Sequence, residues 1–180
     1  MTALPDALAG VSARIEQMTA LDAPAEFVQR IVRSTFGSGR LDEILGGEPL
    51  THPLHPALVA IPAGSWLSAS ILDVTGGDAR AARRLIAFGC LAAVPTAASG
   101  ARDWSRTVGE QRRIGFAHAL LNDAALFTYG ASWLARRRGH RARGAGLSLV
   151  GAGFLGAAGW LGAHLVFTQR VGVAAGVDPR

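Results

Sequence analysis

Long apolar runs separated by short charged stretches dominate most of this chain. Four such runs, rich in Leu, Val, Ile, Ala and Gly, lie at about 56–74, 85–101, 114–135 and 145–169. A helix needs about 20 residues, with a range of about 17–25, to cross the hydrocarbon core of a bilayer. Each run is long enough, and the connections between the runs are short. We therefore predict an all-α fold in which residues 51–173 form a four-helix transmembrane bundle.

The first 50 residues show a different pattern, in which apolar and polar positions alternate with the period of a helix. The apolar positions of this repeat are Leu8, Val11, Ile15 and Met18. Such a pattern is typical of an amphipathic helix, and a second short helix is expected after the break at Asp22 and Pro24. We predict an amphipathic helical N-terminal extension over 1–50 that lies on the membrane surface or caps the bundle. Residues 174–180 would form a tail.

A soluble helical bundle is the alternative, and it would require a polar stripe on every helix. The first, second and fourth apolar runs have almost no polar residues other than Ser and Thr. The third run is the least apolar, because it contains His118, Asn122 and Asp123. The pattern therefore favours membrane insertion.

Charge and composition refine this picture. The net charge is +5, and all 18 basic residues are arginines. They are spread over short loops, which favours contact with anionic lipid and argues against nucleic-acid binding. The positive-inside rule predicts that the arginine-rich loops at 76–84 and 136–143 are cytoplasmic. Cys90 is the only cysteine, and no zinc-binding pattern of cysteines and histidines is present.

Four antiparallel spans would bring four of the five histidines to one side of the membrane. These are His52, His55, His118 and His164. Neutral imidazole is a common ligand of haem iron, and cofactor sites in bundles use side chains from facing helices. We therefore expect a haem b site, with His55 and His118 or His52 and His164 as candidate axial pairs. The protein would then exchange electrons with a membrane redox partner.

Two other roles for the histidines remain open. They can bind loop carbonyls, water or Asp103, which would make the chain a non-catalytic membrane scaffold or accessory subunit. Alternatively, together with Asp103 they can bind zinc or copper in a metal-binding or transport protein. Four short-looped helices would need a homo-oligomer to form a transport pathway. No Ser–His–Asp order, phosphate loop or acidic pair indicates an enzyme.

Two further polar residues are candidates for function, because polar groups within spanning segments are costly. Asp73 ends the first apolar run on the side opposite the histidines, where we expect it to pair with Arg83 or Arg84. Asn122 lies four residues after His118 and shares its helix face.

A family resemblance adds to this interpretation. The stretch GGEPLTHPLHPALVAIPAGSWLSASILDV, followed by ASGARDW, RRIGFAHALLND and LGAHLVFTQRVGV, resembles the DUF2231 family of bacterial integral membrane proteins of unknown function over about 41–173. The resemblance implies four spans in the bacterial cytoplasmic membrane. Some relatives are joined to Rieske-type iron–sulfur domains, which implies membrane redox chemistry, but this chain lacks the cysteines of such a domain. The motif positions are His52, His55, Asp73, Asp103, His118, Asn122 and His164.

Overall fold

Helices make up the fold of residues 3–172, the part of the chain that this computed structural model describes, and no strand occurs there. Three short helices come first: α1 (Ala3–Gln17), α2 (Asp22–Phe36) and α3 (Gly39–Gly46). Four long helices follow: α4 (Leu54–Val74), α5 (Ala79–Trp104), α6 (Gly109–Arg137) and α7 (Arg141–Ala163). A π-helical turn, His164–Thr168, extends α7.

Local sequence signals explain where the long helices begin and end. Pro53 precedes α4, and Pro56 stands in its first turn, where a missing N–H costs nothing. Asp78 caps α5, because its Oδ1 accepts a hydrogen bond from the backbone N–H of Arg80 at 2.7 Å. Gly76 and Gly139 follow α4 and α6 with φ of 71° and 86°, a conformation that favours glycine. Each of the first three predicted apolar runs thus lies within one long helix, and the fourth lies on α7 and its π-helical turn as far as Thr168.

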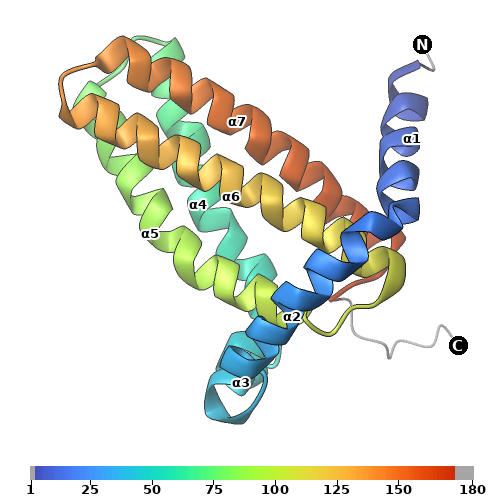
Figure 1. Ribbon diagram of the computed structural model, residues 1–180. Helices are drawn as coiled ribbons and strands as arrows, with labels where there is room; N and C mark the ends of the chain where they lie inside the picture. The colour runs from blue at the N-terminus through green and yellow to red at the C-terminus, as the bar shows by residue number, and fades with distance from the viewer. Residues whose placement is uncertain (1–2, 173–180) are drawn as a thin grey trace, which may run out of the picture.

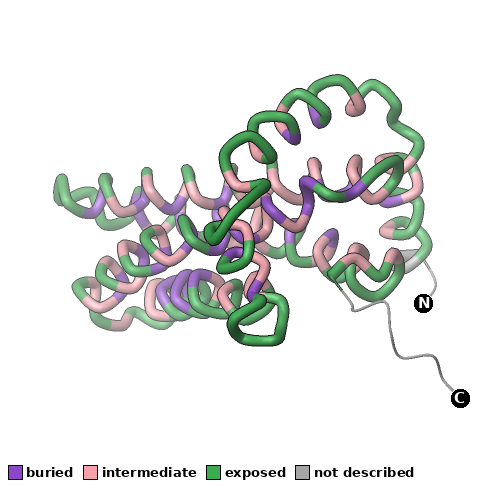
Figure 2. Tube along the Cα trace, turned by 90° about the horizontal axis from the view of Figure 1, so that it is seen from below, coloured by how far each residue is buried: buried purple, intermediate pink, exposed green. Residues whose placement is uncertain are grey.

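The four long helices pack side by side (Figure 1), with α5 and α7 each lying between α4 and α6. The diagonal pair, α4 and α6, meets through side chains: the rings of Trp66 and Tyr129 stack with centroids 4.6 Å apart. Ile86 and Ala69 are fully buried beside them. Figure 2 shows buried positions turned toward the neighbouring helices and exposed positions outside.

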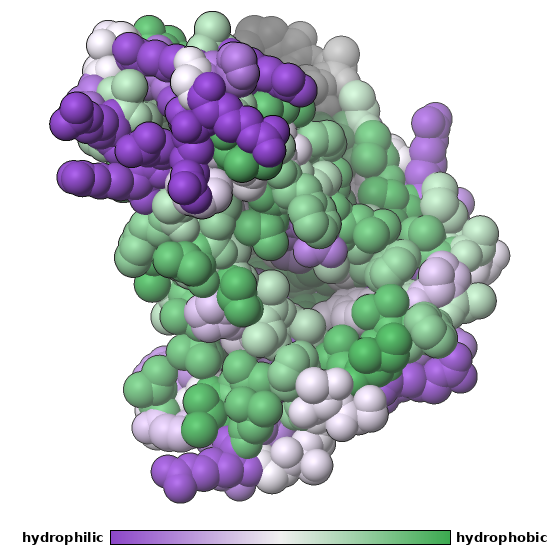
Figure 3. Space-filling view, turned by 60° about the vertical axis from the view of Figure 1, so that its left-hand side comes forward, coloured by the Kyte–Doolittle hydropathy of each residue, from purple (hydrophilic) through white to green (hydrophobic). Residues whose placement is uncertain are grey.

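The outer surface of these helices is apolar. Large side chains there are widely exposed, including Leu91 at 73%, Phe127 at 75% and Phe167 at 82%. Figure 3 shows a broad hydrophobic band between two hydrophilic ends. A continuous apolar surface of this kind marks contact with lipid or with another protein rather than with water.

Among residues 3–172, three helices are long and apolar enough to cross a membrane: α4, α5 and α7 with its π-helical turn. Helix α6 is longer than α4 but does not reach the same hydropathy, because His118, Asn122 and Asp123 stand in its first half. The all-helical class of the prediction is therefore confirmed, and three of the four predicted runs lie on helices with the length and apolar character that a membrane span needs. The four-helix transmembrane bundle remains a proposal.

The first three helices, here called the N-terminal cap (α1, α2 and α3), gather at one end of the long helices. Helix α1 packs against α6, α2 packs against α5 and α6, and α3 packs against α4 and α5. Figure 1 shows α2 crossing the end where α5 stops and α6 begins. This is the end to which the sequence assigned the four histidines.

Candidate functional site

His55 and His118 occupy equivalent positions on the diagonal helices α4 and α6. The Nδ1 of His55 lies 2.9 Å from the carbonyl oxygen of Thr96 on α5, and the Nδ1 of His118 lies 2.8 Å from that of Ala158 on α7. A carbonyl oxygen can only accept, so Nδ1 carries the proton in both rings and Nε2 carries the lone pair. Each histidine thereby links its helix to the next one.

Glycine makes room for both rings. A Cβ on Gly100 would lie 2.7 Å from an imidazole carbon of His55, and a Cβ on Gly162 would lie 3.0 Å from one of His118. Such distances are shorter than ordinary van der Waals contact, so the ring and the helix backbone touch. His55 and His118 are the pair that the sequence proposed for haem.

The partners of the two Nε2 atoms differ. Asn122 lies on the same face of α6, as predicted, and its Nδ2 donates to the Nε2 of His118 at 3.1 Å. The same amide group also donates to the backbone oxygen of His118 at 2.9 Å. The Nε2 of His55 has no hydrogen-bond partner among residues 3–172. Of the two rings, only His55 has a free ligating nitrogen.

His52 and His164 do not form the second predicted pair. His52 is exposed, and its Nδ1 lies 3.1 Å from the backbone oxygen of Leu50, two residues earlier. The Nε2 of His164 lies 2.8 Å from Oε1 of Glu16 in the N-terminal cap, an oxygen that also accepts from Gln169 at 2.7 Å. Within the described part of the chain, no three His, Cys, Asp or Glu side chains form a group that could hold a metal ion.

Asp73 is buried at the opposite end of the helices, and its partner is Arg136 of α6 rather than Arg83 or Arg84. The guanidinium binds both carboxylate oxygens, and both side chains are only 3% exposed. Arg136 also donates to the hydroxyls of Ser132 and Ser148, each at 3.2 Å. The prediction named the wrong arginine because α6 returns to this end of the bundle and turns Arg136 inward.

Asp103 lies beside Arg102, whose Nη1 is 3.2 Å from its Oδ1. No hydrogen bond joins Asp103 to a histidine in the described residues. Arg102 also binds Asp42 of α3 through Nε at 2.8 Å and Nη2 at 3.1 Å. Asp103 therefore belongs to a cluster of charges under the N-terminal cap rather than to a ligand set.

Ion pairs hold the N-terminal cap on the long helices. Asp22, the first residue of α2, binds Arg113 at 2.7 Å and Arg112 at 2.9 Å. These hydrogen bonds, with Arg113 contributing most, lower the pKa of Asp22 from 3.8 to about 2. Asp42 is shared by Arg102 and Arg106 in the same way, and Arg102 is the main cause of its lowered pKa.

Sequence reasoning missed this network, although a signal for it was present. Nine of the twelve carboxylates within 3–172 lie at the end that carries the cap, where arginines cluster at 102–113. Acidic residues in an amphipathic segment and arginines at the ends of spanning helices have complementary charges. To predict which of them pair, one would have to know that the cap folds back onto 102–113.

Comparison with known proteins agrees with this architecture. The family model described as "Predicted membrane protein (DUF2231)" matches residues 51–175. Searches of curated proteins and of solved structures gave no match. The matched region begins just before α4, includes all four long helices, and covers well over half of the chain. The chain therefore belongs to the DUF2231 family of predicted membrane proteins.

Proposed function

We propose that this protein is a four-span, non-catalytic accessory subunit that holds the N-terminal cap at one face of a membrane. The observation that carries the proposal is the clamp on Asp22, which Arg112 and Arg113 bind together at the start of α6. Two guanidinium groups share this carboxylate, so the first residue of α2 is tied to the first turns of α6. The clamp fixes the orientation of α2 relative to the bundle.

In this proposal α6 is the fourth span. It is joined to α7 near both ends, since His118 reaches Ala158 and the hydroxyl of Ser132 donates to the carbonyl of Gly144 at 2.6 Å. A helix tied to a spanning neighbour at both ends runs alongside it. The polar groups of α6 are then tolerated because most of them find partners within the protein.

The same proposal places the arginine-rich loops 76–84 and 136–143 in the cytoplasm. The arginines at the cap end of α5 and α6 are largely neutralised by carboxylates of the cap. The opposite end has seven arginines without an ion pair among the described residues, and they support the cytoplasmic assignment. They are Arg80, Arg83, Arg84, Arg137, Arg138, Arg141 and Arg143.

A second candidate function is haem b binding by His55 and His118, and the observation that favours it is the pair of Nδ1 hydrogen bonds. Ligating histidines usually donate their other N–H to a carbonyl or carboxylate, which orients the ring. The fit is partial, because Asn122 would have to release Nε2 of His118. Bound haem would supply one-electron chemistry, and a membrane redox partner would be required.

One preparation tests both functions. The protein is purified in detergent, incubated with haem, and examined by a reduced-minus-oxidised spectrum and by limited proteolysis. The accessory-subunit proposal predicts a colourless protein whose cap resists cleavage, and an Asp22→Asn, Asp42→Asn variant whose cap is cut. A bis-histidine spectrum that is lost in His55→Ala and His118→Ala, but kept in the matched control His52→Ala, would replace it with the haem function.

A further inference from the structure

We propose that a pocket between α2 and the connection from α5 to α6 binds the phosphate group of an anionic phospholipid. This binding site goes beyond the accessory function. It rests on the membrane insertion proposed above, but on neither role of the histidines. The phosphate is held by Arg30 and Arg33 of the N-terminal cap, and the acyl chains lie along apolar side chains beside the pocket.

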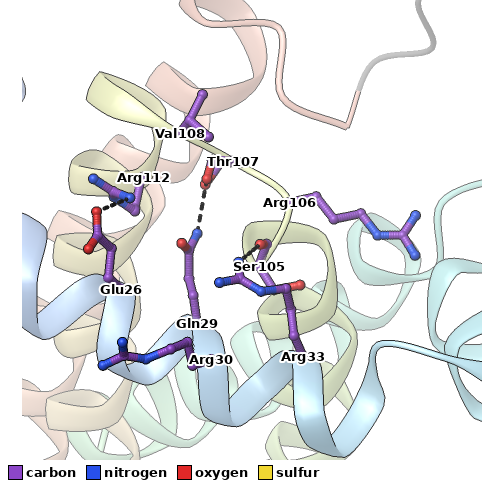
Figure 4. Close-up of a pocket in the computed structure, with 9 residues that line it drawn as sticks. All are labelled: Glu26, Gln29, Arg30, Arg33, Ser105, Arg106, Thr107, Val108 and Arg112. Atoms are coloured by element: carbon purple, nitrogen blue, oxygen red, sulfur yellow. Dashed lines mark hydrogen bonds and ion pairs between the residues drawn. The ribbon is translucent and has the colours of Figure 1, made fainter.

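The pocket has a volume of about 490 Å³ and a strongly basic lining. Four of its lining residues are arginines, Arg30, Arg33, Arg106 and Arg112, and one is a carboxylate, Glu26. Figure 4 shows Gln29 rising from α2 between Glu26 and Arg33, with Arg30 extending along the helix below it. Its Nε2 donates to the carbonyls of Trp104 and Thr107 at 2.9 and 3.0 Å, so α2 and the connection are held at a fixed separation.

Some hydrogen-bond donors of the pocket arginines have no partner within the protein. Arg106 and Arg112 have carboxylate partners, but Arg30 and Arg33 form no ion pair within residues 3–172. Arg33 donates one N–H to the carbonyl of Ser105 at 2.7 Å, which leaves its other donors available. The Nε of Arg112 is buried without a partner. Guanidinium groups bind phosphate oxygens with pairs of parallel hydrogen bonds, so the free donors of Arg30 and Arg33 suit a phosphate.

The position of the pocket favours a lipid over free phosphate. It is lined by the residues that join the end of α5 to the start of α6, which is the depth of the headgroup layer if both helices span the bilayer. Val108 lines it with 72% of its surface exposed. On α2, Phe27 and Ile31 are 57% and 50% exposed. A phosphate site bordered by exposed apolar side chains matches a headgroup with its attached acyl chains.

Native mass spectrometry of the delipidated protein tests the site by titration with phosphatidylglycerol and, separately, phosphatidylcholine. We expect the wild type to retain phosphatidylglycerol preferentially. The variant Arg30→Gln, Arg33→Gln should bind it about 25-fold more weakly, because each arginine near an anionic lipid contributes about a factor of five. The control Arg84→Gln, Arg143→Gln removes the same charge at the opposite end and should bind like the wild type.

Further measurements separate loss of the site from loss of the fold. Arg30 is exposed and donates no hydrogen bond within the described residues, and its guanidinium carbon lies 5.9 Å from the ring centroid of Phe27 on the same helix. We therefore expect Arg30→Gln alone to keep the fold and to weaken binding about five-fold. Carbonate extraction reports membrane insertion independently of lipid selectivity. Equal retention of both lipids by the wild type, or equal loss in the pocket and control variants, would overturn the proposal. Arginine-dependent binding of inorganic phosphate without lipid preference would assign the pocket to a soluble anion and overturn the lipid assignment.

Discussion

Removing the carboxylate of Asp73 should destabilise the protein more than any other single change at that end of the bundle. Its side chain and that of Arg136 are each only 3% exposed, and they face each other through two hydrogen bonds. Asp73→Asn would leave a buried guanidinium without a counter-charge. Breaking a buried ion pair in this way costs about 3–5 kcal/mol, so we expect the free energy of unfolding to fall by about that amount.

The double variant Asp73→Leu, Arg136→Met distinguishes two free energies: the cost of leaving one buried charge without a partner, and the net contribution of the intact ion pair to stability. Replacing both charges by apolar groups of similar volume is often neutral or stabilising. The hydroxyls of Ser132 and Ser148 would keep each other as partners at 3.0 Å. We therefore expect the double variant to recover to within about 1 kcal/mol of the wild type, whereas the single variant does not.

Unfolding by SDS in mixed micelles, followed by tryptophan fluorescence, measures these free energies. Arg138→Met is the matched control, because Arg138 is exposed and its side chain has no hydrogen bond in the described residues. A loss below about 1 kcal/mol in Asp73→Asn would show that the pair is hydrated. A double variant as unstable as the single one would show that the reasoning about the uncompensated charge is wrong.

Three other predictions follow from the geometry of the cap, the histidines and α6. The two arginines that bind Asp22 lower its pKa from 3.8 to about 2. The stabilisation of the folded cap by these ion pairs is therefore complete above about pH 4 and is lost as the pH falls through about 2. Pepsin cleavage of the cap should rise over that range, and a rate of cleavage that does not change with pH would contradict this. Gly100→Ala places a Cβ 2.7 Å from the ring of His55 and should cost about 1–3 kcal/mol, whereas Gly153→Ala, with open space around it, should cost nothing in the same thermal unfolding assay. Asp123 is exposed on α6, so Asp123→Leu should make the free energy of membrane insertion of 109–137 more favourable by about 3 kcal/mol. A glycosylation reporter assay measures this insertion, and an unchanged insertion free energy would argue against α6 as a span.

The histidines show how far topology alone can be taken. Antiparallel helices of known length bring His52, His55, His118 and His164 to the same end, and the structure places them there. Their side chains nevertheless have four different surroundings. His118 reaches a carbonyl of α7, and His164 reaches Glu16, 148 residues away in the sequence. The prediction of a shared end was correct, but the second candidate pair, His52 and His164, does not form, because each of these side chains binds another partner.

For the charged residues, the sequence located a candidate but not its partner. Asp73 was recognised as a candidate from its place at the end of an apolar run, but its partner is Arg136, 63 positions away, instead of the arginines that follow it closely. The sequence pattern assigned no partners to the carboxylates of the N-terminal cap. They proved to be the partners of arginines on α5 and α6.

The amino-acid sequence was sufficient for the helical class, the approximate bounds of the four long helices and the apolar character of three of them. These properties depend on residues within one or two turns of each other, so the spacing of apolar residues, the prolines and the glycines report them directly. The tertiary structure decided which imidazole nitrogen remains free, which arginine neutralises Asp73, and how the cap is held beside the arginine pocket. Those outcomes depend on the rotation of each helix about its axis, which is set by packing between segments far apart in the chain.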